Sequence, residues 1–353
     1  MSIVDFEVLK HLNTHNLPKQ AENESTRKLE GKNGEIAPAR SPRNVQIDFL
    51  KGLLVLTMII YHVSYNFYQN HYSIIAITQF ASGAFIYITG FFVGYYYLNR
   101  YPNRLDITKR LFIRFLKLFL IFSLPNIFLF LKSKSFIDVL YTYFILGTGK
   151  THFEILLPIA YTLFFSSFLV LFVEKHEYCF HVLLIIPYLL VIFNIIHLPT
   201  NSLFCLIGLF GFANSLLISR LRNSLPLKAV CFIAAVVLGW SFLEFEIQKN
   251  SILYLLYIIT VLVSLYNIGC FLSFKTKLEK WIVLIGRYTL FAYLYHLVII
   301  VSAYSLFPIK VNACLTFAII VFVTFILVVS LFLLERLRRK VTIINKSYGF
   351  IFS

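Results

Sequence analysis

The most visible pattern in this sequence is a series of long apolar runs separated by short polar and charged segments. The runs cover about 47–67, 79–98, 111–131, 155–173, 180–197, 203–219, 228–243, 251–272, 282–304 and 313–334. A stretch of about 20 mostly apolar residues is long enough to cross a bilayer as an α-helix. The pattern therefore predicts an all-α, polytopic membrane protein with about ten transmembrane helices.

Composition agrees with this prediction. Of the 353 residues, 59% are hydrophobic and only 14% are charged, whereas soluble domains carry roughly 25% charged residues. The five cysteines fall singly inside or beside the apolar runs. Because they have no metal-ligand spacing, we expect no metal site and no disulfide framework.

The basic residues give the predicted helices an orientation. A net charge of +16 would suit a nucleic-acid-binding protein, but most Lys and Arg side chains lie in short connections between apolar runs. With a cytoplasmic N-terminus, every second connection faces the cytoplasm, and those connections carry most of the basic residues. The positive-inside rule then places both termini in the cytoplasm. We therefore expect a multi-pass protein of an inner or plasma membrane, with the bilayer rather than nucleic acid as its partner.

The sequence divides into three parts. Residues 1–44 are polar, mixed in charge and poor in aliphatic side chains, which is typical of a disordered cytoplasmic tail. Residues 45–335 form the predicted membrane domain. Residues 336–353 form a basic cytoplasmic tail that begins with Arg336, Arg338, Arg339 and Lys340.

The first run contains ionisable residues that need an explanation, because a charge inside a membrane helix is costly. Lys51 lies near the expected cytoplasmic end, one turn after Asp48. His62 follows eleven residues later, about 16 Å further along a helix at 1.5 Å per residue. This places a cation near the cytoplasm and an imidazole in the outer half of the membrane.

The ninth run repeats this arrangement with Arg287 and His296, nine residues apart. His152 precedes the fourth run on its outer side, next to Glu154. The three histidines are therefore candidates to converge in the outer half of the membrane, above a group of cations.

These residue types suit a particular chemistry. A neutral imidazole titrates close to physiological pH and can take a proton from a hydroxyl as that hydroxyl attacks a carbonyl carbon. Cations at the cytoplasmic face suit a phosphorylated ligand, and arginine does so through its planar fork. Simpler interpretations stay open: the histidines as polar contacts between helices, Lys51 as a snorkelling side chain, and Arg114 and Lys117 as cytoplasmic anchors.

Several stretches of the sequence, among them "IDFLKGLLVLTMIIYH" and "LIGRYTLFAYLYHLVI", resemble motifs of the acyltransferase-3 family of integral membrane acyltransferases. "IDFLKGLLVLTMIIYH" is similar to its first span, with Asp48, Gly52 and His62 in place and Lys51 where the family usually has Arg. "GAFIYITGFFVG", residues 83–94, resembles its second span. "KRLFIRFLKLF" resembles the basic start of its third span; it contains Arg114, and Lys117 replaces a second arginine.

A late motif completes the resemblance. "LIGRYTLFAYLYHLVI" is similar to the family's Gly, Ser/Thr and Tyr-Leu-x-His pattern, which Gly286, Thr289, Tyr293 and His296 match. "THFEILLPIAY", with His152 and Glu154, resembles the start of the fourth span in some members. The resemblance extends over about residues 43–335, and the glucan succinyltransferases and transmembrane glucosaminide acetyltransferases share similar first and second spans.

The resemblance implies an enzyme that transfers an acyl group, commonly acetyl from acetyl-coenzyme A, to a hydroxyl of a carbohydrate or lipid-linked glycan of the cell envelope. His62 would be the general base, with His296 and Asp48 also assigned to catalysis. Lys51, Arg114, Lys117 and Arg287 would bind the phosphates of the donor. The substrate-binding residues would be His152, Tyr293 and Glu154.

Two other function classes fit the sequence less well. A transporter or flippase for a glycolipid or metabolite would need acidic residues within the spans or an inverted repeat, and neither is evident. A structural subunit fits three convergent histidines poorly. The sequence leaves open whether the acyl group is acetyl or succinyl and which molecule accepts it. It also leaves open whether the reaction uses a ternary complex or an acyl-enzyme, and whether the protein is a homodimer. Asn66, Gln69 and Asn70, which are polar residues assigned to the outer loops, are candidate contacts of the acyl acceptor.

Overall fold

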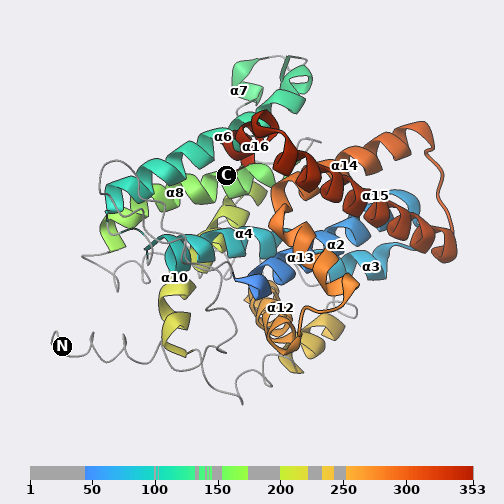
Figure 1. Ribbon diagram of the computed structural model, residues 1–353, viewed down its shortest axis with the longest axis horizontal. Coiled ribbons are helices and arrows are strands. Elements are labelled where there is room, and N and C mark those ends of the chain that lie inside the picture. Colours follow the sequence, from blue (N-terminus) through green and yellow to red (C-terminus); the bar gives the residue numbers. More distant parts are fainter. Residues whose placement is uncertain are drawn as a thin grey trace. The chain divides into compact units, whose positions relative to one another are not determined.

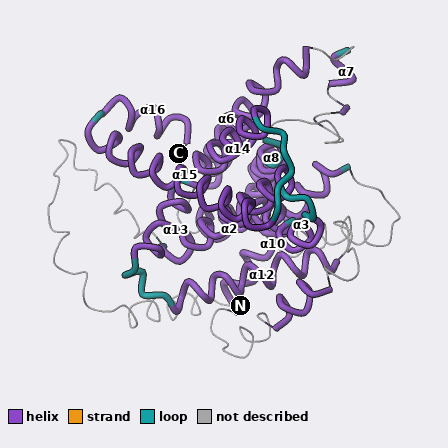
Figure 2. Tube along the Cα trace, turned by 90° about the vertical axis from the view of Figure 1, so that its right-hand side faces the viewer, coloured by secondary structure: helices purple, strands orange, loops and turns teal. Residues whose placement is uncertain are grey.

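The computed structural model describes residues 44–98, 101, 103–131, 135–139, 141–142, 144, 153–173, 199–221, 233–241 and 252–352. Within these residues all regular structure is helical, as Figure 2 shows. This confirms the predicted all-α class. The N-terminal tail to residue 43, the predicted fifth span and His152 lie outside the described residues, as do residues 228–232 and 242–243 of the predicted seventh span.

The helices follow the apolar runs (Figure 1). Their bounds are α2 Val45–Phe67, α3 Tyr72–Thr78, α4 Phe80–Phe92, the π-helix η1 Val93–Tyr97, α6 Arg104–Leu131, α7 Phe136–Val139, α8 Leu156–Val173, α10 Thr200–Leu221, α12 Ile252–Phe271, α13 Lys277–Arg287, α14 Thr289–Leu306, α15 Ala313–Lys340 and α16 Thr342–Phe352. A further helix covers residues 233–241.

Five described helical stretches are long and apolar enough to cross a membrane. They are Val45–Phe67, Tyr72–Tyr97, Leu253–Phe271, Thr289–Leu306 and Ala313–Lys340; Leu156–Phe172 is a shorter apolar helix. Several of them expose large hydrophobic side chains, such as Phe317 and Phe322 of α15. Exposed apolar surface of this kind suits contact with lipid tails. The chain is therefore a membrane protein with several spanning helices.

Helix α2 is the centre of the described packing. It contacts α13, α12, α14, α15, α3 and α4, and its side chains Leu54, Val55, Ile59 and Val63 are completely buried. Its start is set locally, because the Asn44 side chain accepts a hydrogen bond from the Ile47 main-chain N–H. Such an N-cap satisfies one of the free N–H groups at a helix start.

A second group of helices packs through small residues. A Cβ atom on Gly90 of α4 would collide with the main-chain oxygen of Gly208 on α10, and a Cβ on Gly211 would collide with the main-chain oxygen of Tyr87. Glycines at such positions allow close backbone approach, the usual basis of helix packing in membranes. Gly208 also lies against the Thr162 side chain, so that α8 joins α4 and α10.

The expected single span over residues 282–304 is wrong in its bounds. Helix α13 ends at Arg287 and α14 begins at Thr289. The Thr289 hydroxyl donates to the Gly286 carbonyl, an acceptor that a continuing helix would pair with its own main chain. A capping box of Thr276 and Glu279 starts α13 upstream. Arg287 and His296 therefore lie on different helices, unlike Lys51 and His62, which share α2.

The connection between α14 and α15 is tied to the end of α2. The Val311 N–H donates to the Phe67 carbonyl at 2.6 Å, and the Gln69 N–H donates to the Val311 carbonyl at 3.3 Å. The Lys310 Nζ donates to the Tyr65 carbonyl at 2.7 Å. These bonds hold the C-terminal ends of α2 and α14 on the same side of the bundle.

Candidate functional site

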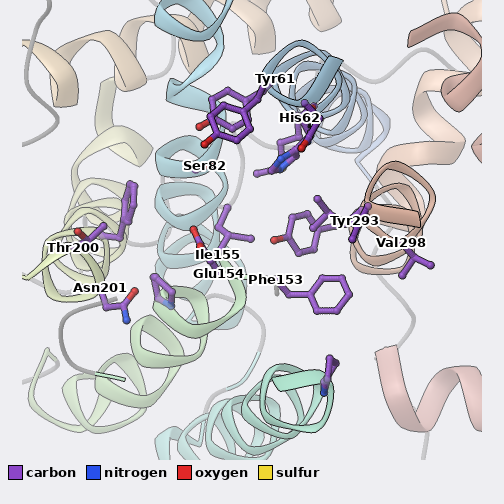
Figure 3. Close-up of a pocket in the computed structure, with 18 of the residues that line it drawn as sticks. Tyr61, His62, Ser82, Phe153, Glu154, Ile155, Thr200, Asn201, Tyr293 and Val298 are labelled. Atoms are coloured by element: carbon purple, nitrogen blue, oxygen red, sulfur yellow. Dashed lines mark hydrogen bonds between the residues drawn. The ribbon is translucent and has the colours of Figure 1, made fainter. Parts of the chain in front are cut away.

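A cavity of about 620 Å³ lies between α2, α8, α10 and α14. His62, Tyr293 and Glu154 line it, and Figure 3 shows these three side chains around a common space with Phe153. Its wall also contains Tyr61, Tyr65, Asn66, Ser82, Asn201 and Ser302. A cavity of this size that combines apolar walls with a few polar groups is typical of a small-molecule or cofactor site.

His62 is presented to the cavity by α2. Its neighbour Tyr61 lies edge-on to the imidazole, with ring centroids 5.1 Å apart. The Asn66 side chain donates a hydrogen bond to the His62 carbonyl one turn later. Among the described residues, we find no hydrogen bond to the His62 imidazole itself. Its ring nitrogens are therefore available to a ligand in the cavity.

His296 lies behind His62 rather than in the cavity wall. It is completely buried on α14, and its ring centroid is 5.7 Å from that of His62. The Tyr293 ring lies at the same centroid separation from His296, nearly perpendicular to it. The structure thus brings His62, Tyr293 and His296 into one cluster, with His62 and Tyr293 next to the cavity.

The start of α8 completes the wall. Phe153 has a φ of 60°, a left-handed conformation that is uncommon for a bulky residue. This turn places Glu154 and Ile155 beside the cavity. The Tyr293 hydroxyl oxygen accepts a hydrogen bond from the Ile155 main-chain N–H, and the Phe153 ring packs edge-on against the Tyr293 ring. Tyr293 is therefore held between α14 and the start of α8.

The assigned cations surround the other end of α2. The Lys51 Nζ lies 2.9 Å from the Asp48 carboxylate and 5.7 Å from the centroid of the Phe92 ring. The Arg114 guanidinium lies over the Tyr97 ring at 5.2 Å. Because Phe92 directly precedes η1 and Tyr97 is its last residue, these contacts bring Lys51 and Arg114 to the same short segment.

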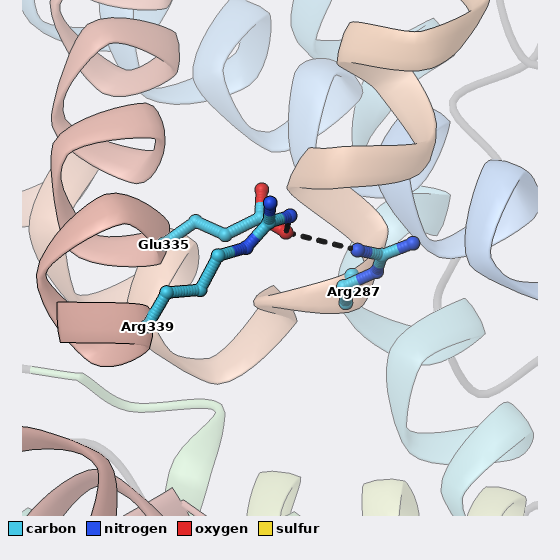
Figure 4. A network of polar contacts seen from close by, with 3 residues as sticks. All are labelled: Arg287, Glu335 and Arg339. Carbon is cyan, nitrogen blue, oxygen red and sulfur yellow. Dashed lines mark hydrogen bonds and ion pairs between the residues drawn. The ribbon is translucent and has the colours of Figure 1, made fainter. Parts of the chain in front are cut away.

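Lys117 and Arg287 have partners from the C-terminal helices. The Lys117 Nζ lies 5.2 Å from the centroid of the Phe350 ring on α16. Arg287 donates to the Glu335 carboxylate at 3.2 Å, and Arg339 donates to the same oxygen at 2.7 Å (Figure 4). Arg287 follows Gly286, which touches the Asp48 carbonyl. Arg287 is therefore close to the first turn of α2.

The site residues assigned from the sequence thus fall into two groups. His62, His296, Tyr293 and Glu154 gather at the cavity, and Asp48, Lys51, Arg114 and Arg287 gather around the start of α2. Sequence reasoning missed Tyr61, Asn201 and Ser302. Tyr61 and Ser302 gave a signal, since each is a polar side chain within an apolar run, whereas Asn201 lies in the polar connection between two runs. Of the three candidate contacts of the acyl acceptor, Asn66 is among the residues that line the cavity.

Comparison with known proteins agrees with the resemblance noted in the sequence. A family profile described as an acyltransferase domain, of the acyltransferase-3 type, matches residues 44–333. No curated protein and no solved structure matches the chain significantly. The matched region covers all the described helices from α2 to most of α15. The chain therefore belongs to the acyltransferase-3 family and is a membrane acyltransferase.

Proposed function

We propose that this acyltransferase moves an acetyl group from acetyl-coenzyme A to a hydroxyl of a carbohydrate or glycolipid, with His62 as general base. One observation carries the proposal: His62 lines a cavity of about 620 Å³ and its imidazole has no hydrogen-bond partner among the described residues. A general base must reach the hydroxyl proton that it removes. A ring nitrogen that was already bonded to the protein could not accept this proton.

The donor would bind along α2. Its phosphates would meet Lys51, Arg114, Lys117 and Arg287, and its thioester would reach the cavity at His62. The separation of Lys51 and His62, about 16 Å along the helix, suits the long pantetheine arm of coenzyme A. One N–H of Lys51 is bonded to Asp48. Its other N–H groups and those of Arg114 would meet the phosphate oxygens beside the rings of Phe92 and Tyr97.

The arrangement in the membrane follows from the charges. We propose ten membrane crossings with both termini in the cytoplasm, in an inner or plasma membrane, because the connections that would then be cytoplasmic carry most of the Lys and Arg residues. Lys51 would then lie near the cytoplasm, where acetyl-coenzyme A is available. The acyl acceptor would approach His62 from the opposite side, past Tyr65 and Asn66.

The test is hydrolysis of radiolabelled acetyl-coenzyme A by purified protein in nanodiscs. We expect wild-type protein to bind the donor and release coenzyme A, and His62→Ala to bind it without turnover. His71→Ala is the matched control, because His71 does not line the cavity; its ring packs against the lining residue Tyr65 and its Nδ1 lies near the Tyr68 carbonyl. Turnover by His62→Ala at the wild-type rate would exclude His62 as the base. Failure of the wild-type protein to bind acetyl-coenzyme A would exclude the proposed donor.

A further inference from the structure

One nitrogen atom of His296 has an unusual environment. The ring Nδ1 lies 2.9 Å from the Ala292 carbonyl oxygen. Because a carbonyl oxygen only accepts hydrogen bonds, Nδ1 carries the proton, and in the neutral imidazole Nε2 then has a lone pair. This Nε2 is buried and has no hydrogen-bond partner within the described part of the chain.

A buried polar atom without a partner is uncommon and usually has an explanation. Here the neighbouring rings are those of His62 and Tyr293. The Tyr293 hydroxyl oxygen accepts a hydrogen bond from the Ile155 main-chain N–H, which holds that hydroxyl at the start of α8. No hydrogen bond holds the His62 ring among the described residues, so we take His62 as the neighbour that donates a ring N–H to His296.

The separation of the two histidines fits a bond between them. Their centroids are 5.7 Å apart, only slightly more than two facing imidazoles need for an N–H···N bond of about 3 Å. A small rotation of the His62 ring about its side-chain torsions would close this difference. Catalytic hydrogen bonds are often long in the absence of substrate and shorten when it binds.

Resting on the proposed function, we infer that His296 is a positioning residue for His62. Its Nε2 accepts a hydrogen bond from one ring N–H of His62, which leaves the other His62 nitrogen unprotonated and directed into the cavity. His296 thereby selects the tautomer in which His62 can act as a base. Its own Nδ1 proton stays bonded to the Ala292 carbonyl throughout.

The proton path is then complete. As the hydroxyl oxygen of the acyl acceptor bonds to the thioester carbon, its proton moves to the free nitrogen of His62. The resulting imidazolium has two N–H groups, and the one that faces His296 makes a charge-assisted hydrogen bond to Nε2, which is stronger than a neutral one. The C–S bond breaks, and His62 returns the proton to the leaving thiolate of coenzyme A.

The direct test is the tautomeric state of His62 by ¹⁵N NMR. Protein labelled with ring-¹⁵N histidine is studied in nanodiscs, and His62 is assigned as the signals that disappear in His62→Ala. We expect a single His62 tautomer in the wild type and a mixture in His296→Leu. A mixture of both tautomers already in the wild type would overturn the inference, and this measurement does not depend on the folding of any His296 variant.

Enzyme kinetics provide a second test of the positioning role of His296. In the acetyl-coenzyme A hydrolysis assay, His296→Leu is expected to lower kcat by about 10- to 100-fold with little change in KM. His296→Gln, whose amide oxygen lies about where Nε2 does, should recover much of this loss. Equal damage in both variants, with wild-type melting temperatures, would contradict the positioning role. Full turnover by His62→Ala would refute the proposed function itself, and this result can be distinguished from a failure of the positioning role of His296.

Discussion

Gly52 of α2 and Gly286 of α13 bring the main chains of their helices into direct contact. A Cβ on Gly52 would collide with the Ile282 carbonyl, and a Cβ on Gly286 would collide with the Asp48 carbonyl. Both glycines belong to the motifs that mark the family in this sequence. Their contact holds Arg287, which follows Gly286, near the turn that contains Asp48 and Lys51. The two motifs therefore form one structural unit.

This contact predicts that Gly286→Ala destabilises the protein. The added methyl group must push α13 away from α2, and overpacking of this kind typically costs about 1–3 kcal/mol. We expect a lower melting temperature in detergent, measured by the loss of the monodisperse peak in size-exclusion chromatography after heating. Gly349→Ala is the control, because no atom lies within 4 Å of a Cβ at that position. Equal melting temperatures for both variants would contradict the close contact.

The Asp48–Lys51 ion pair predicts a coupled effect on stability. The Asp48 side chain is only 4% exposed and that of Lys51 is 21% exposed, so Lys51→Ala removes a cation from a buried carboxylate. We expect a loss of about 1–3 kcal/mol, most of which Asp48→Asn in the same chain recovers. A double-mutant cycle from thermal unfolding measures the coupling. Additive losses from the two single substitutions would exclude a significant interaction.

The assignment of Arg287 to the donor predicts an effect on binding rather than on folding. Arg287→Met should weaken acetyl-coenzyme A binding by about tenfold, roughly 1.4 kcal/mol, as measured by scintillation proximity with labelled donor. Arg339→Met is matched to it, because Arg339 bonds to the same Glu335 oxygen but its side chain is 76% exposed on α15. Similar weakening in both variants would indicate that only the net charge matters.

The cavity predicts a specific role for the Tyr293 hydroxyl. Tyr293→Phe keeps the ring that packs against Phe153 and His296 but removes the hydroxyl that bonds to the Ile155 main chain. A lost hydrogen bond of this kind is worth about 1 kcal/mol, so we expect kcat/KM to fall about fivefold. Tyr304→Phe on the same helix, whose ring packs on Phe67, should have wild-type kinetics. Equal kcat/KM values for the two variants would show that the Tyr293 hydroxyl has no role in the reaction.

Helix α16 predicts a change in protease sensitivity. The Arg338 guanidinium lies over the rings of Tyr288 and Tyr348 at 5.4 and 4.0 Å and donates two hydrogen bonds to Asn345. Arg338→Ala should release α16 and speed cleavage after Lys346 by endoproteinase Lys-C several-fold. Arg336→Ala, two residues before Arg338 on α15, is the control. Unchanged cleavage in Arg338→Ala would show that other contacts hold α16.

Much of the site followed from local sequence. Lys51 and His62 share one uninterrupted apolar run, so their placement at two levels of α2 required only the rise of an α-helix. The same reasoning failed for Arg287 and His296. Their run is just as apolar, but α13 ends between them, where the Tyr288 backbone (φ −110°, ψ 33°) leaves the helical conformation. Hydropathy does not register this break, because it depends on the backbone conformation of one residue.

The sequence by itself determined that the chain is helical, that it lies in a membrane, and which family it belongs to. Each of these depends on patterns that neighbouring residues create: apolar runs, charges between them, and short motifs at fixed spacing. Only the tertiary structure decided that His62 faces a cavity while His296 packs behind it. Whether a side chain on a buried helix meets a cavity or another side chain depends on the rotation and approach of the neighbouring helices. Contacts between distant residues, such as Gly52 and Gly286, set that approach.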